Sequence, residues 1–152
     1  MLIFKKNKNT QNIPKIRQFA RCICLQALYQ WHMTKQSYID LKAQFLNKKN
    51  KQNIDQKLFT GLLQGVITHV DTLDTILIPL IKQKDNHLNP IELNILRMGT
   101  FELIYSIHIP KKVIINECIE LGKKFGATDG YKYINGMMDQ LVKKCEPYLI
   151  TV

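Results

Sequence analysis

The chain has 152 residues, and its 22 lysines and arginines exceed its 12 aspartates and glutamates by ten. Hydrophobic residues make up 45% and charged residues 22%, which excludes a disordered chain and suits one globular domain or two small halves sharing a core. The longest apolar run, residues 76–81, is far shorter than the ~18 residues that a membrane span needs, and no apolar leader opens the chain. We therefore expect a cytoplasmic protein without a membrane partner.

The excess positive charge lies in the first third of the chain. Residues 1–57 contain 12 basic and only two acidic residues, whereas residues 58–152 contain ten of each sign. Such segregation produces a local positive field and indicates a polyanionic partner, of which nucleic acid is the commonest. The alternative is a lysine-rich composition with a solvated basic tail, and it has most weight for Lys5, Lys6 and Lys8.

Hydrophobic residues recur with the helical period of 3.6 nearly throughout, so we predict an all-α protein. Residues 1–13 lack this period and are predicted to form a basic flexible arm. Pro14 suits the first turn of a helix over residues 14–32, whose apolar stripe, including Trp31, is expected to enter the core. A separate arc of this helix is expected to face outward and carries Arg17, Gln18, Arg21, Leu25 and Tyr29.

Polar caps divide the next part of the chain. Ser37 and Asp40 have capping-box spacing and are predicted to open a short helix that ends near residue 46. Residues 47–53 are predicted to form a polar, basic loop. Asp55 is predicted to cap a long amphipathic segment, with a break near residues 68–71 where a threonine and an aspartate again have cap spacing.

The polar stretch at residues 82–89 is the predicted boundary between an N-terminal helical half, residues 14–83, and a C-terminal helical half, residues 84–152. The two halves are expected to share one compact domain. Pro79 should end or kink the last helix of the first half, because proline disrupts the interior of a helix.

Three predicted helices make up the second half. The first opens with Asn89 as cap, Pro90 at the first helical position and Glu92 at the third, and it is apolar on nearly all sides, which is typical of a buried helix. The second runs from Pro110 to Gly126. Residue 128 or 129 is predicted to cap the third, which Pro147 closes.

Catalytic and metal-binding motifs are missing from this sequence. It has no nucleophile elbow, no phosphate-binding glycine loop and no histidine pair with ligand spacing. The four cysteines form no CxxC pair and are expected to be buried free thiols in a reducing compartment. We therefore expect a protein that is not an enzyme and that binds no metal or cofactor.

Four segments together resemble one family. They are RQFAR at 17–21 with QALYQW at 26–31, NPIELNILRMGTFEL at 89–103, IPKKVIINECIELGKKFGATD at 109–129 and GYKYINGMMDQL at 130–141. Over about residues 15–146 the chain resembles the bacterial NusB family of transcription antitermination factors. The resemblance implies about seven helices in two small packed bundles. It also implies binding of single-stranded boxA RNA in ribosomal RNA transcripts together with NusE, a small-subunit ribosomal protein, so that RNA polymerase reads through terminators.

The resemblance also implies roles for particular residues. The arginine-rich motif of the family falls on Arg17 and Arg21, although Gln18 and Phe19 stand where cations are common. Tyr29 and Glu92 match positions tied to complex formation with NusE or RNA, and the resemblance does not separate the two roles. Single-stranded RNA requires cations for its phosphates and flat side chains for its unstacked bases. The RNA-binding residues expected on these grounds are Lys15, Arg17, Arg21, Tyr29, Asp129, Lys132 and Tyr133.

Alternatives remain at several of these positions. Tyr133 could simply pack at the start of a helix, Glu92 could be only a capping residue, and Asn135–Gly136 could mark a close helix contact. Two other functions also remain. One is a helical adaptor whose basic end meets an acidic protein. The other is an RNA-modifying enzyme, since NusB-like modules occur fused to ribosomal RNA methyltransferases, although this chain has no nucleotide-binding domain.

Overall fold

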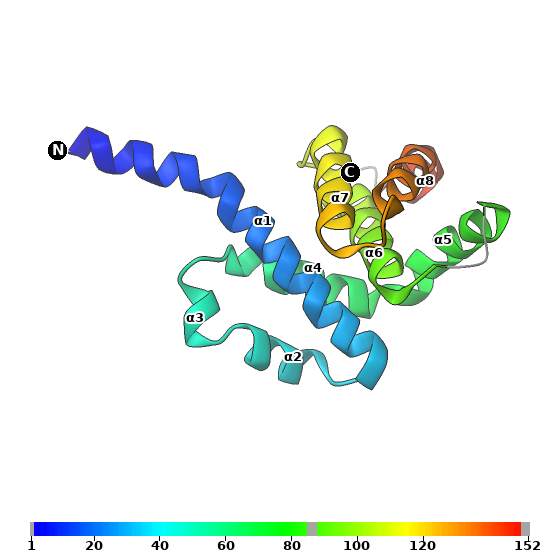
Figure 1. Ribbon diagram of the computed structural model, residues 1–152, viewed down its shortest axis with the longest axis horizontal. Helices are drawn as coiled ribbons and strands as arrows, with labels where there is room; N and C mark the ends of the chain where they lie inside the picture. Colours follow the sequence, from blue (N-terminus) through cyan, green and yellow to red (C-terminus); the bar gives the residue numbers. More distant parts are fainter. Residues whose placement is uncertain (1, 85–87, 150–152) are drawn as a thin grey trace. The chain divides into compact units, whose positions relative to one another are not determined.

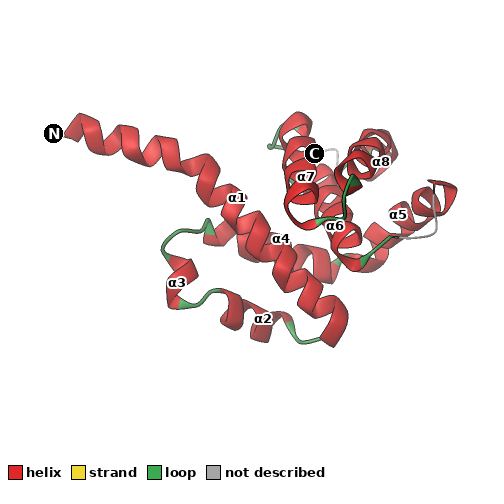
Figure 2. Cartoon of the chain, viewed as in Figure 1, coloured by secondary structure: helices red, strands yellow, loops and turns green. Residues whose placement is uncertain are grey.

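The computed structural model describes residues 2–84 and 88–149, with side chains for residues 13–83 and 88–149. The described residues form eight α-helices and one short 3-10 helix and contain no strand (Figure 2). The predicted all-α class is therefore confirmed. The chain divides into two compact units, Met1–Leu63 and Gln64–Val152.

The first unit contains α1 (Leu2–Thr34), α2 (Tyr38–Phe45), α3 (Lys48–Lys51) and the start of α4 (Gln56–Thr68). Helix α1 begins well before the predicted start, and Pro14 lies inside it rather than at its first turn. The lysines of residues 1–13 lie outside the described side chains. Helix α2 packs against α1 and begins as predicted, with the Ser37 hydroxyl accepting a hydrogen bond from the Asp40 N–H at 3.2 Å.

The predicted loop at residues 47–53 contains one turn of helix, α3. Asn47 caps this turn by accepting a hydrogen bond from the Asn50 N–H at 3.0 Å, and Asn is among the best N-cap residues. Helix α4 has the predicted cap, because Asp55 Oδ1 accepts a hydrogen bond from the Leu58 N–H at 3.0 Å. It ends at Thr68, within the predicted break.

The second unit contains α5 (Val70–Lys84), α6 (Pro90–Tyr105), α7 (Lys111–Phe125), α8 (Gly130–Lys144) and a 3-10 turn (Glu146–Tyr148). Helix α5 packs against α6 and α8, so it belongs with the second unit rather than the first. The predicted boundary at residues 82–89, part of which lies outside the described residues, therefore separates two helices of one unit. Helix α5 also continues through Pro79, which does not end it.

Helix α6 is the centre of the second unit and packs against α5, α7 and α8 (Figure 1). Eleven of its 16 residues are buried, as its lack of a polar face predicted. The Asn89 side chain caps it by accepting a hydrogen bond from the Glu92 N–H at 2.9 Å. Gly65 of α4 leaves room for α6, because a Cβ atom at this position would lie 2.1 Å from Cζ of Phe101.

A buried ion pair joins α5 to α6. Arg97 donates two hydrogen bonds to Asp74, from Nε to Oδ1 at 2.9 Å and from an outer guanidinium nitrogen to Oδ2 at 2.7 Å. The side chains are 9% and 22% exposed. This two-point geometry fixes the orientation of both groups, which makes Arg97 a structural cation and not a surface charge.

Candidate nucleic-acid interface

The first group of predicted RNA-binding residues lies on α1. Lys15 is exposed, and Arg17 is half exposed with its Nε 3.6 Å from Oδ2 of Asp55. The same aspartate caps α4, and its backbone N–H donates to the Ile16 carbonyl at 3.3 Å. Asp55 thus joins the start of α4 to α1 and forms an ion pair with the half-exposed Arg17 guanidinium.

Arg21, which the sequence placed on the outward arc of α1, is only 3% exposed. Leu25 on the same arc is 2% exposed. The expectation assumed one buried stripe, but the middle of α1 is buried on most sides, as the following residues show: Ala20, Arg21, Ile23, Cys24, Leu25, Ala27 and Leu28. The prediction that Arg21 lies on an exposed arc of α1 is therefore wrong, and its role in RNA binding stays a prediction.

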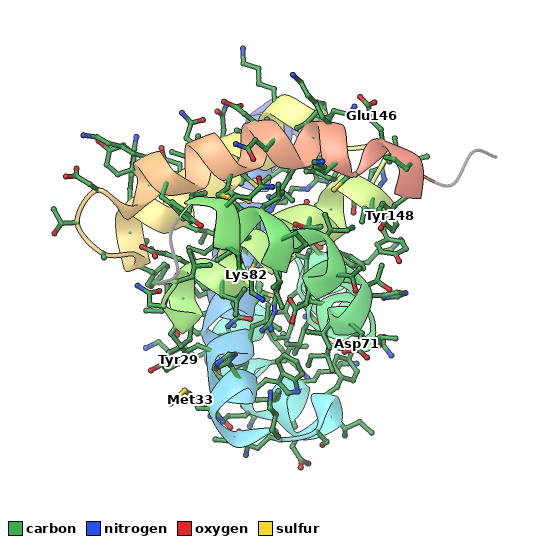
Figure 3. All side chains as sticks on the ribbon, turned by 90° about the vertical axis from the view of Figure 1, so that its right-hand side faces the viewer. Tyr29, Met33, Asp71, Lys82, Glu146 and Tyr148 are labelled. Atoms are coloured by element: carbon green, nitrogen blue, oxygen red, sulfur yellow. The ribbon has the colours of Figure 1, made fainter. Side chains whose placement is uncertain are left out.

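The last turns of α1 expose two large side chains. Tyr29 is 40% exposed and Met33, one turn later, is 61% exposed, and both project from the same side of the helix (Figure 3). Trp31 is only half buried rather than in the core, and the Lys35 ammonium lies 4.5 Å from its ring centroid. This end of α1 offers an apolar surface with an aromatic hydroxyl group.

The second group lies where α7 turns into α8. Asp129 is the N-cap residue of α8, but its side chain makes no capping hydrogen bond, and its backbone is left-handed with φ 64°. Its Oδ1 instead lies 3.5 Å from Nζ of Lys132, and both side chains are 66% exposed. The turn therefore presents a carboxylate and an ammonium group to solvent, at a helix start where backbone N–H groups also favour anions.

Tyr133 is half buried, and its hydroxyl oxygen is buried. The ring is therefore only partly available for stacking. Sequence reasoning missed a second aromatic residue here, Tyr131, which is also half buried and lies at the start of α8. The Lys123 ammonium lies 5.4 Å from the centroid of its ring. The basic–aromatic pattern was visible in the sequence, but the pairing of Lys123 with Tyr131 depends on how α7 packs against α8.

Glu92 is 7% exposed, so most of its side chain is hidden from a partner. A Cβ atom at Gly130 would lie 2.2 Å from Glu92 Oε1, and one at Gly126 would lie 3.5 Å from it. The carboxylate thus fits against the glycines on both sides of the α7–α8 turn. A side chain at position 130 would collide with this carboxylate unless Glu92 moved, and the role of Glu92 in complex formation stays a prediction.

Three of the four cysteines are buried as predicted, whereas Cys22 is half buried. Cys24, Cys118 and Cys145 are buried, and burial raises the pKa of Cys145 to about 11 although Lys111 acts in the opposite direction. The thiol of Cys145 therefore stays protonated at neutral pH. Within residues 2–84 and 88–149 no cluster of three or more histidine, cysteine or acidic side chains has the arrangement of a metal site, and no helix is long and apolar enough to cross a membrane.

Comparison with known proteins gives one family. The profile of the NusB family matches residues 18–143. Transcription antitermination protein NusB of Legionella pneumophila (strain Corby) is 44% identical over 125 residues, which cover 82% of this chain and 85% of that protein. Its counterpart in Alcanivorax borkumensis is 42% identical over 136 residues, covering 90% and 91% of the two chains.

Solved structures agree on the fold. NusB of T. maritima has a TM-score of 0.68 at 26% identity, covering 84% of this chain and 90% of that one. The NusB chain in a crystal structure of antitermination factors NusB and NusE with double-stranded RNA has a TM-score of 0.74 at 24% identity, covering 85% and 97%. These similarities support the all-α architecture.

Proposed function

Because the chain belongs to the NusB family, we propose that it is an RNA-binding transcription antitermination factor. It binds boxA in ribosomal RNA transcripts together with NusE and helps RNA polymerase to read through terminators. It acts in the cytoplasm and without catalysis. The observation that carries the proposal is the similarity to antitermination proteins over 82–90% of the chain.

The two groups of surface residues divide the work of RNA binding. Lys15 and Arg17 on α1 and Lys132 on α8 contact phosphates, because Lys and Arg neutralise the backbone charge. Tyr133 supplies a partly exposed ring for one base. Asp129 accepts a hydrogen bond from a base amino group, since a carboxylate has no donor and repels phosphate.

NusE binds at the exposed end of α1. Tyr29 and Met33 form an apolar surface there, and tyrosine and methionine are enriched in protein interfaces. Glu92 contributes indirectly by holding the α7–α8 turn in shape, since its carboxylate is packed against Gly130. The tyrosine therefore belongs to the protein interface and the glutamate to the support of the RNA site.

The test is a gel-shift or anisotropy titration of boxA RNA and a scrambled RNA, each with and without NusE. We expect a clear preference for boxA and an increase in affinity of about tenfold with NusE, because a composite surface pre-organises the binding site. The log of the binding constant should fall with log salt at a slope of roughly −2 to −3.5, for three to five phosphate contacts.

A double-stranded boxA control separates the two forms of RNA. Preference for the single strand is expected, because unstacked bases are needed for a ring such as that of Tyr133. Equal binding of boxA and scrambled RNA under all conditions would refute the proposal. Binding of NusE without any RNA dependence would favour the helical adaptor instead.

A further inference from the structure

Three lysines that the proposed RNA site does not use lie together on α3: Lys48, Lys49 and Lys51, here named the lysine loop. All three are exposed. The neutral side chains of the segment hold it in place. Besides the Asn47 cap, the Asn50 side-chain amide donates to the Phe45 carbonyl at 2.8 Å, and the Gln56 amide donates to the Lys51 carbonyl at 3.2 Å.

The charges of the lysine loop are not neutralised. Within the described side chains, none of the three lysines forms an ion pair, and the nearest acidic residue along the chain, Asp55, is 3.6 Å from Arg17. Of the 12 basic residues in 1–57, the predicted RNA site uses Lys15, Arg17 and Arg21, and the last of these is buried. Six of the 12 basic residues lie outside α1, and three of those six are in the lysine loop.

The lysine loop is joined to the basic surface of α1. After α3 the chain returns to α1, where α4 begins (Figure 1). There the Asp55 N–H donates to the Ile16 carbonyl, and the Asp55 carboxylate pairs with Arg17. Lys51 precedes Asp55 by four residues, a span of at most about 14 Å. The lysine amines thus lie within reach of an RNA strand that touches Lys15 and Arg17.

We propose that the lysine loop is a second, sequence-indifferent contact for the phosphate backbone of single-stranded RNA flanking boxA. This rests on the proposed function, because the RNA that reaches the loop is the one held at α1. The loop has unpaired cations for phosphates but no aromatic ring for bases, and phosphate contacts carry no sequence information. It therefore adds affinity without adding preference for boxA.

An acidic protein is the less suitable partner for this surface. Protein interfaces depend on buried aromatic or apolar anchors and are depleted in lysine. Within α3 and the described residues that flank it, 46–55, no large hydrophobic side chain is exposed, although Ile39 of α2 is 74% exposed. The lysine loop thus has the charge that RNA requires and lacks the anchor that a protein partner requires.

The experiment uses the triple variant Lys48→Gln/Lys49→Gln/Lys51→Gln of the full chain. The RNAs are boxA extended on both sides by unrelated single-stranded sequence and a scrambled RNA of equal length. Fluorescence anisotropy gives the binding constants from 50 to 200 mM salt. A matched control, Lys112→Gln/Lys143→Gln/Lys144→Gln, removes three exposed, unpaired lysines from the second unit and changes the net charge equally.

On these extended RNAs the three contacts named above and three in the lysine loop give wild type a slope of about −4, at ~0.7 per contact, whereas boxA alone does not reach the loop. The slope of the triple variant should be shallower by about two. Between 50 and 200 mM salt, wild type should therefore lose about 20-fold more affinity than the variant. Both RNAs should be affected alike, the control should behave as wild type, and circular dichroism should be unchanged. A slope equal to that of wild type overturns the proposal, as does an equal effect of the control.

One further outcome identifies a different partner. If the triple variant binds RNA as wild type does but binds NusE more weakly, the lysine loop is a protein contact and the proposal is wrong. Failure of the proposed function is recognised separately, because it would appear as a loss of boxA preference in wild type. The slope difference is measurable on scrambled RNA in either case.

Discussion

Replacing Asp55 with asparagine should increase RNA affinity. Asp55 places a negative charge 3.6 Å from Arg17, and the two side chains are 25% and 50% exposed. A pair this exposed contributes about 0.2–1 kcal/mol, and the carboxylate competes with an RNA phosphate for the guanidinium. Asparagine caps a helix about as well as aspartate, so the start of α4 is preserved. We expect boxA binding to tighten by about 1.4- to 5-fold, the range equivalent to that energy.

The assay is anisotropy with labelled boxA RNA at 100 mM salt, with thermal melting as the control for folding. Glu120→Gln is the matched variant, because it also removes one carboxylate from an exposed pair, with Lys123 at 3.4 Å. It lies outside the proposed α1 contact and should change affinity less. Weaker binding of Asp55→Asn, or an equal gain for Glu120→Gln, would show that Asp55 does not compete with an RNA phosphate for Arg17.

Three further variants test the site and the core. Tyr133→Ala should weaken RNA binding by about 1–3 kcal/mol, and it should also lower the melting temperature because the ring is half buried. Tyr133→Phe should keep the RNA affinity. An unchanged RNA affinity for Tyr133→Ala would leave Tyr133 only a packing role. Gly65→Ala should lower the free energy of unfolding by about 1–3 kcal/mol, because the added methyl group clashes with the Phe101 ring. Gly61→Ala has open space around it and should raise that free energy by about 0.5–1 kcal/mol. Urea unfolding should therefore give changes of opposite sign for the two variants. Asp74→Ala should cost about 2–4 kcal/mol of unfolding free energy in the same assay, because it removes the carboxylate that faces the buried Arg97 guanidinium. A loss below about 1 kcal/mol would contradict the buried-pair argument.

Local interactions were predictable from the sequence. The caps at Ser37, Asp55 and Asn89 form as expected, because a cap depends on residues three apart in the chain. The burial of α6 was predictable for a similar reason, since a helix without a polar face is buried whichever helices surround it. Each of these features follows from a short stretch of sequence.

Features that depend on the number of neighbours were not predictable. A helical wheel of α1 places Arg21 outside because it assumes one buried stripe, and the observed helix is buried on most sides around this residue. Glu92 fits the third helical position so well that its contact with Gly130 gave no signal of its own. The continuation of α5 through Pro79 shows in the same way that helix packing can offset an unfavourable residue.

The family-matched cations Arg17 and Lys132 differ in one physical respect from the lysines of α3, which match no family position. Arg17 and Lys132 each have a carboxylate within 3.6 Å, so binding a phosphate replaces an existing partner, and the net gain is small. The lysines of α3 have no such partner among the described side chains, so they release counterions on binding and contribute more to the salt dependence. The unpaired lysines are therefore suited to supplying affinity, and the paired cations contribute less of it.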